Sequence, residues 1–154
     1  MADVVSYSSF SQALGHAQAQ ISRRAVREPV FYVGGTTRAP TDRWNFNSGR
    51  DCGGRLGVPH CERFRQMHVL VKGQGFEIAS LEKELVQKYR RSDSRCANLA
   101  AGGGGFEHDK PHAFLYVCVG LGPRFSFSAM ASSSTAAVGP AASSAATSSV
   151  ASLH

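Results

Sequence analysis

The fold is decided by the stretch Phe31-Tyr-Val-Gly-Gly-Thr-Thr-Arg-Ala-Pro-Thr-Asp-Arg-Trp44. The apolar run Val30–Val33 is rich in aromatic and β-branched residues, which are typical of a short buried strand. The pair Gly34-Gly35 ends this run and lets backbone approach backbone closely. Pro40 then favours a helical φ angle, and Asp42 falls in the first turn of the helix. We therefore expect a strand, a tight turn and the beginning of a helix.

Two side chains of this stretch are suited to chemistry. Tyr32 lies at the end of the expected strand, and Arg43 lies on the helix that follows. The turn between these elements brings a phenol and a guanidinium to face one cleft. We therefore take Tyr32 and Arg43 as candidate site residues.

Length and composition limit the class of protein. The chain of 154 residues is long enough for one domain with tails, and its 42% of hydrophobic residues can form a core. It has no run of about 18 apolar residues, so we expect no membrane span. The formal net charge of +6 favours a polyanionic partner, although many basic proteins bind no nucleic acid.

The spacing of apolar residues divides the chain into segments. We expect an N-terminal amphipathic helix or extension over 1–28, one domain over 29–122 and a disordered Ala- and Ser-rich tail over 123–154. The first segment also has the Ala-, Ser- and Arg-rich composition of an organelle-targeting presequence. Helices are expected over 8–25, 40–47 and 77–91, and strands over 30–33, 67–71 and 112–120. These elements predict an α+β fold with a small three-stranded sheet flanked by helices.

The expected helix over 77–91 contains an acidic residue in an unusual position. Its apolar stripe consists of Ile78, Leu81, Leu85, Val86 and Tyr89. On a helical wheel Glu82 falls inside this stripe, whereas Glu77 and Glu84 fall outside it. A buried carboxylate is costly unless it pairs with a cation or binds a metal. Glu82 is therefore a candidate ligand for a hard divalent ion, and an ion pair with Arg43 is the alternative.

The connection from Arg38 to Arg65 is basic and resembles a loop. It contains six arginines, only three acidic residues and several glycines. Arginine pairs bidentately with phosphate, so this segment can grip a nucleic-acid backbone. A solvated loop without a ligand is the alternative.

The cysteines and histidines give no metal motif. Four scattered cysteines favour reduced intracellular thiols. Cys52, His60, Cys61 and His68 have side chains that could bind zinc. Their spacing does not match a standard set of zinc ligands.

The motif Tyr32-Val33-Gly34, followed by Arg43-Trp44, resembles the second half of the GIY-YIG nuclease domain. In that family a Tyr-Ile/Val-Gly strand end precedes an arginine on a short helix. The segment Leu81–Val86 is similar to the metal-binding helix of the family, and Asn98 with Gly102–Gly105 is similar to its closing segment. The resemblance covers about half of the chain and implies a GIY-YIG-like, mainly antiparallel three-stranded sheet.

The sequence departs from the family pattern in two places. No Gly-Ile-Tyr strand precedes Tyr32, and Asn47 stands where the family often has a histidine. The segment Phe114–Val117 has the shape of the missing strand, with a tyrosine among apolar residues. It would pair beside Phe31–Gly34, as in a circular permutation, and Tyr116 would replace the first tyrosine. The alternative is an ordinary additional strand.

The resemblance implies a metal-dependent endonuclease that hydrolyses phosphodiester bonds in DNA, or in RNA. An Mg²⁺ or Mn²⁺ ion on Glu82 would stabilise charge on the scissile phosphate. Arg43 would hold the phosphoryl oxygens, and Tyr32 with Tyr116 would orient or deprotonate the attacking water. Contacts with the nucleic acid are expected from Arg38, Arg50, Arg55 and Asn98.

Two other functions agree with the same residues. One is a catalytically degenerate GIY-YIG-like module that binds nucleic acid without cutting it. The other is an unrelated small α+β interaction protein. We expect an intracellular protein, in the nucleus or an organelle, and the sequence leaves its oligomeric state open.

Overall fold

The computed structural model describes residues 7–46, 59–99, 102 and 107–124. In chain order its elements are α1 (Phe10–Ala25), β1 (Phe31–Thr36), α2 (Pro40–Asn45), α3 (His60–Arg63), β2 (Phe64–Gly73), α4 (Gly75–Ser92) and β3 (Ala113–Leu121). The strands form one sheet of order β1-β3-β2, and β3 is antiparallel to both of its neighbours. The expected α+β class with a small antiparallel three-stranded sheet is therefore confirmed.

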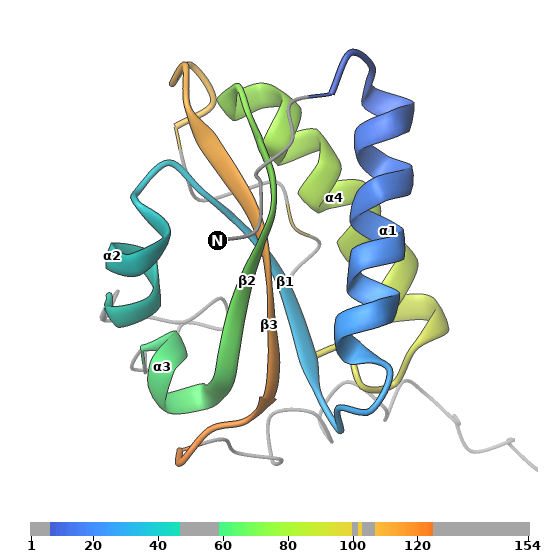
Figure 1. Ribbon diagram of the computed structural model, residues 1–154, viewed down its shortest axis with the longest axis vertical. Helices are drawn as coiled ribbons and strands as arrows, with labels where there is room; N and C mark the ends of the chain where they lie inside the picture. Colours follow the sequence, from blue (N-terminus) through green and yellow to red (C-terminus); the bar gives the residue numbers. More distant parts are fainter. Residues whose placement is uncertain (1–6, 47–58, 100–101, 103–106, 125–154) are drawn as a thin grey trace, which may run out of the picture.

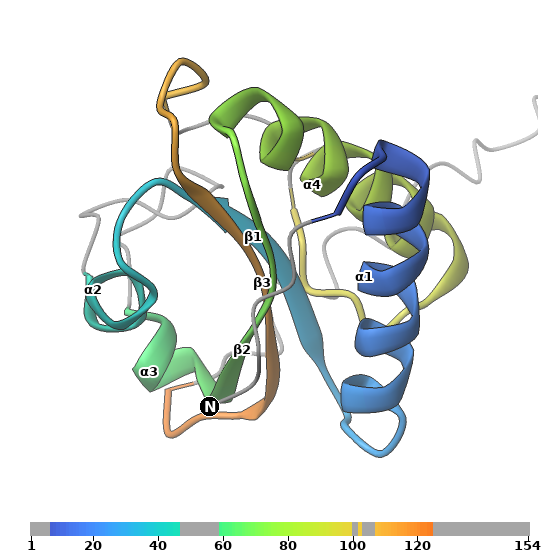
Figure 2. The same ribbon diagram turned by 45° about the horizontal axis from the view of Figure 1, so that its top comes forward.

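Helices cover both faces of the sheet. Helices α1 and α4 pack on one face, whereas α2 and α3 lie on the other, as two views show (Figure 1 and Figure 2). Side chains alternate along a strand, so Phe31 and Val33 of β1 join the core under α1 and α4. Tyr32 points to the opposite face, where Tyr116 and Cys118 of β3 also lie. The sheet thus separates the main core from the layer that holds Tyr32 and Tyr116.

Helices α1 and α4 form where apolar periodicity predicts them. Ser9 caps α1 by accepting a hydrogen bond from the backbone N–H of Gln12 at 3.3 Å. At the start of α4, Gln74 and Glu77 form a reciprocal capping box. Alanines and Ile21 on α1 pack into the same core as α4. Within the described ranges, no helix combines the length and the apolar character needed to cross a lipid bilayer.

Two expectations about element boundaries are wrong. Gly34-Gly35 does not end the first strand, because β1 continues through both glycines to Thr36 and pairs with β3 along this length. The expected loop to Arg65 ends earlier, since α3 begins after Pro59 and β2 begins at Phe64. The completely buried ring of Phe64 anchors the start of β2. Residues 47–58, and the expected tail from 125 onward, lie outside the described residues.

A segment that follows α4 closes the outer edge of β1. The backbone N–H of Phe31 donates to Arg95 O at 3.0 Å, and that of Ala97 donates to Phe31 O at 2.8 Å. Asn98 continues this pairing with its side chain. Its Nδ2 donates to Val33 O at 2.7 Å, and its Oδ1 accepts from Val33 N at 2.9 Å. Asn98 is only 8% exposed, so it satisfies two backbone groups that water does not reach.

We expect the substitution Asn98→Ala to lower the free energy of unfolding by about 2 kcal/mol or more, because it leaves two buried backbone groups of Val33 without partners. Urea denaturation of the purified protein measures the change. Asn45→Ala is the matched control, since the Asn45 amide makes an exposed hydrogen bond to Thr41 O. Its effect should stay within about 0.5 kcal/mol. Equal effects of the two substitutions would contradict this role of Asn98.

Candidate functional site

Tyr116 is the centre of the candidate site. It lies on the middle strand β3, where its partner in the register is Gly34 of β1. The phenol crosses over this glycine: a Cβ atom at position 34 would lie 2.5 Å from Tyr116 Oη and 2.8 Å from Tyr32 Cε1. The ring centroids of Tyr32 and Tyr116 are 6.4 Å apart. The expected pairing of the Tyr116 segment with β1 is confirmed, and its role as the first tyrosine of the family stays a prediction.

Two basic side chains reach the Tyr116 hydroxyl from the helices on this face. Arg43 of α2 donates from Nε to Tyr116 Oη at 3.1 Å. The Nε2 atom of His60, on α3, lies 2.9 Å from the same oxygen. Because arginine can only donate, the phenol oxygen accepts from Arg43, and it can offer its own hydrogen to the His60 tautomer whose Nε2 is unprotonated. A chain of hydrogen bonds therefore runs from the guanidinium through the phenol to the imidazole.

Burial determines the protonation of this cluster at neutral pH. Tyr116 is completely buried, and His60 is 7% exposed. Burial, followed by the positive charges of Arg43 and Arg63, lowers the pKa of His60 to about 3. Burial also raises the pKa of Tyr116, although the charge and the hydrogen bond of Arg43 act in the opposite direction. The imidazole and the phenol are therefore both neutral at pH 7.

The charge of Glu82 affects the pKa of the Tyr116 phenol. Glu82 is 6% exposed, whereas Glu77 and Glu84 of the same helix are exposed, which confirms the prediction from the helical wheel. Its negative charge is one of the causes that raise the pKa of Tyr116. The carboxylate on α4 and the phenol on β3 are thus close enough to influence each other.

The side chains around Tyr116 offer few ligands for a divalent ion. Glu82 supplies carboxylate oxygens, whereas the guanidiniums of Arg43 and Arg63 repel a cation. The described part of the chain contains no group of three or more His, Cys, Asp or Glu side chains that could hold a metal ion. Mg²⁺ commonly keeps several waters and uses one or two carboxylates together with phosphate oxygens. The donors therefore fit an ion shared by Glu82, water and a substrate phosphate, and they do not fit a resident structural metal.

The other residues expected to contact nucleic acid differ in how accessible they are and in whether the structure describes them. Arg38 is exposed, and its guanidinium lies over the ring of Phe46, 4.1 Å from the centroid. Arg50 and Arg55 fall outside the described residues. Both polar ends of the Asn98 amide bind the backbone of β1. We therefore assign Asn98 a structural part and leave it out of the proposed contacts.

His60 is a site residue that the sequence did not reveal. In the sequence alone, His60 stands out only as a candidate zinc ligand. Its contact with Tyr116 joins positions 56 residues apart, and it depends on how α3 packs against the sheet. Pro59 indicates the start of a short helix, but no local pattern indicates which side chain that helix presents to Tyr116.

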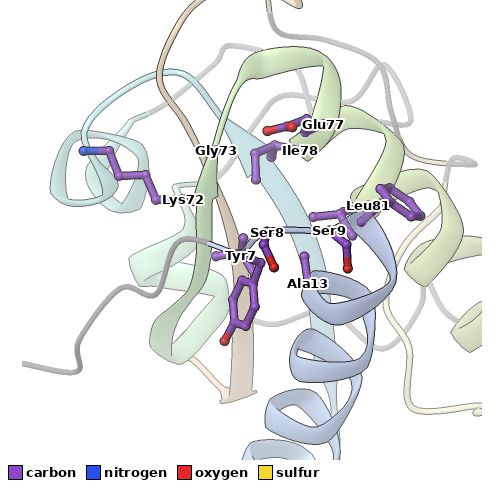
Figure 3. A pocket seen from close by; sticks show the side chains of 11 residues that line it. Tyr7, Ser8, Ser9, Ala13, Lys72, Gly73, Glu77, Ile78 and Leu81 are labelled. Atoms are coloured by element: carbon purple, nitrogen blue, oxygen red, sulfur yellow. The ribbon is translucent and has the colours of Figure 1, made fainter.

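A separate pocket lies on the opposite face of the sheet (Figure 3). It has a volume of about 140 Å³ and lies between the start of α1, the end of β2 and the start of α4. Ala13, Ile78 and Leu81 supply apolar walls, whereas the Lys72 amine extends away from them (Figure 3). Because α2 and α3 cover the other face, this pocket and the Tyr116 cluster are not one cleft.

Comparison with protein-family models, with curated proteins and with solved structures finds no match for this chain. The resemblance to GIY-YIG nucleases thus rests on the motifs and on the arrangement of the residues described above. It stays a prediction, which the proposal below makes testable.

The protonation of His60 should make stability depend on pH. Its pKa is about 3 in the folded protein and about 6.5 in an unfolded chain. The unfolded chain therefore binds the additional proton as the pH falls from about 6.5 to 3. The contribution of His60 to the free energy of unfolding is therefore fully present above about pH 6.5. It decreases by up to about 1.4 kcal/mol for each pH unit below about 6.5, until the pH reaches the folded pKa.

Between about pH 7 and pH 4.5, we expect the unfolding free energy of the wild type to fall by about 2–3 kcal/mol more than that of His60→Gln. Glutamine keeps a hydrogen-bond acceptor but does not titrate. Urea denaturation at each pH measures both proteins, and the other titrating groups are common to them. Parallel pH profiles would show that His60 is not held neutral by the fold.

Proposed function

We propose that this protein is a metal-dependent endonuclease that hydrolyses phosphodiester bonds in DNA, with a GIY-YIG-like site. The observation that carries the proposal is the meeting of Arg43, Tyr116 and Tyr32 on one face, and the charge of Glu82 on α4 also acts on Tyr116. These residues come from α2, β3, β1 and α4, and they are separated by up to 84 positions in the sequence. A shared catalytic task gives a reason for this arrangement, which the packing of a core does not require.

Arg43 suits the binding of a phosphodiester. A guanidinium has five N–H donors, and the hydrogen bond to Tyr116 engages the one on Nε. The fork of terminal amines matches phosphate oxygens in geometry and charge. Arg43 would therefore hold the phosphoryl group beside the phenol and stabilise the charge that develops during hydrolysis.

Tyr116 and His60 would manage the proton of the attacking water. The phenol is neutral in the resting protein, so it orients water rather than acting as a preformed base. Burial is the main cause of the low pKa of His60, and repulsion by Arg43 and Arg63 adds to it; the negative charge of a bound phosphodiester near Arg43 would offset that repulsion. The phenol could then accept a proton from water while it passes its own proton to His60 Nε2.

Glu82 is the residue that would hold Mg²⁺ or Mn²⁺ together with water and substrate oxygens. Such an ion supplies Lewis-acid stabilisation of the leaving oxygen. The same carboxylate also brings negative charge near Tyr116. Neutralising Glu82 should therefore weaken catalysis more than it weakens binding of DNA.

A second candidate function is binding of nucleic acid without cleavage. The complete burial of Tyr116 favours this function, because a phenol that activates water has to be in contact with that water, and the buried Tyr116 is not exposed to solvent. In this function the hydrogen bonds at Tyr116 would only hold α2 and α3 in place. The two candidates differ in whether a nicked product forms.

We expect the purified protein to nick supercoiled plasmid in the presence of Mg²⁺ or Mn²⁺, and we expect Glu82→Gln to lower the rate by at least about 100-fold. The matched control is Glu84→Gln on the exposed side of the same helix, which should keep the rate of the wild type. Gel analysis of nicked and linear products measures both rates. Binding of DNA without nicking would support the second candidate, and absence of binding would support an unrelated interaction protein.

We expect Tyr116→Phe to lower the nicking rate by at least about 100-fold, because the hydroxyl that joins Arg43 to His60 is lost. Affinity for uncut DNA, measured with Ca²⁺ in place of Mg²⁺, should change by less than about 3-fold. Tyr7→Phe removes a hydroxyl far from this cluster and serves as the control. Circular dichroism checks that each variant is folded. A Tyr116→Phe variant that is folded and fully active would rule out this use of the phenol.

A further inference from the structure

The C-terminal ends of α1 and α4 carry a concentration of positive charge. The two helices run side by side in the same direction on one face of the sheet, so these ends lie near each other (Figure 1 and Figure 2). The cations there are Arg23, Arg24, Arg27, Lys88, Arg90 and Arg91, a set that we name the basic end. All of them except Arg24 are exposed.

Direct contacts hold the two helix ends together. The hydroxyl of Tyr89 on α4 donates to Gln18 O on α1 at 3.4 Å. Just after α4, Arg95 donates from Nη1 to Ala25 O at 2.8 Å, and its other terminal amine binds Asp93 at 2.7 Å. The cations of both helices are therefore presented on one rigid support.

The basic end contains as many cations as the net charge of the protein. The chain has 17 Lys and Arg residues and 11 Asp and Glu residues. With the six cations of the basic end set aside, the remaining 11 equal the acidic residues in number. The acidic residues nearest to it are engaged elsewhere, because Asp93 pairs with Arg95 and Glu28 pairs with Arg65. Six of the 17 cations of the chain therefore belong to the basic end.

Neither helix needs these cations in order to end. At the end of α1, Arg95 donates to the carbonyls of Ala25 and Glu28. The last turn of α4 is closed by Asp93 N, which donates to Tyr89 O at 2.8 Å. No side-chain hydrogen bond or ion pair joins a member of the basic end to another residue in the described ranges. The helix dipole favours positive charge here, but one or two cations would satisfy it.

We propose that the basic end is a docking surface for the phosphate backbone of double-stranded nucleic acid. Five of its six cations are arginines, whose planar forks pair with phosphate oxygens. The proposal goes beyond the cleavage of DNA, because this surface lies on the face opposite to Tyr116 and such binding requires no catalysis. It replaces the loop between Arg38 and Arg65 as the main electrostatic contact.

The same charges could attract an anionic membrane, but Val26, which is 67% exposed, is the one large apolar side chain exposed among these cations in the described residues, and the exposed aromatic side chains lie elsewhere. Phe10 and Phe76, which are 44% and 56% exposed, lie in the first turns of α1 and α4. They are therefore at the opposite ends of the two helices from the basic end. Peripheral membrane helices usually present apolar and basic residues together along their length, so the arrangement favours nucleic acid.

The test compares two variants of the full chain that lose the same charge. One carries Arg23→Gln, Arg27→Gln, Arg90→Gln and Arg91→Gln. The control carries Lys72→Gln, Lys83→Gln, Lys110→Gln and Arg124→Gln at exposed positions elsewhere. Fluorescence anisotropy with a short labelled DNA duplex in EDTA measures affinity without cleavage, between about 50 and 200 mM salt. The result therefore does not depend on whether the protein is a nuclease.

We expect the first variant to lose at least about 10-fold in affinity for the duplex. The slope of the logarithm of affinity against the logarithm of salt concentration should become shallower by about one unit for each lost phosphate contact. The control should lose less than about 3-fold. If the quadruple variant unfolds on circular dichroism, the pairs Arg23→Gln/Arg27→Gln and Arg90→Gln/Arg91→Gln are measured separately. Equal losses in both variants, or no binding by the wild type, would overturn the proposal. Arginine-dependent binding to phosphatidylserine vesicles but not to the duplex would also overturn it.

Discussion

One oxygen atom, the Tyr116 hydroxyl, joins both short helices of one layer to the central strand of the sheet. Helix α2 has no buried residue, and the only buried residue of α3 is His60. The partly buried Trp44 of α2 packs against the cluster on this face, and the His60 ring of α3 packs against Phe64. Backbone hydrogen bonds from the segment after β3 also hold α3. Hydrogen bonds from Arg43 and to His60 fix both helices to the central strand through one phenol. That phenol reaches them because Gly34, its partner across the strands, has no side chain.

The two faces of the sheet have different physical characters. Under α1 and α4 lies a broad apolar core in which Phe31, Leu85 and Val117 are almost completely buried. On the other face the buried groups are aromatic and polar, with Tyr32 and Tyr116 packed beside His60. Buried polar groups have to be paired to be stable, so this second layer allows fewer arrangements than the first. Such a layer can hold reactive groups in fixed positions, whereas the apolar core provides most of the stability.

The sequence predicted best what depends on local periodicity. Apolar spacing located α1 and α4, and the same wheel showed that Glu82 turns inward while Glu84 does not. The pairing of the Tyr116 segment with β1 was also accessible, because its residue pattern resembles a known strand. His60 could not be predicted, since its position beside Tyr116 depends on a contact across 56 residues. The part played by Asn98 was likewise hidden, because a buried amide that binds strand backbone and one that binds a ligand look the same in sequence.

The order of the strands has a consequence for how the chain acquires its structure. The central strand β3 is the last of the described elements in chain order, and within the described sheet β1 and β2 both pair with it and not with each other. During synthesis, α1, β1, β2 and α4 emerge from the ribosome before any ladder between strands can form. The sheet then assembles through contacts between residues distant in sequence, and such folding is slow compared with that of helical bundles. Until residue 113 has been made, β1 and β2 lack the strand that pairs with both of them, and during this interval nascent chains are most exposed to association with one another.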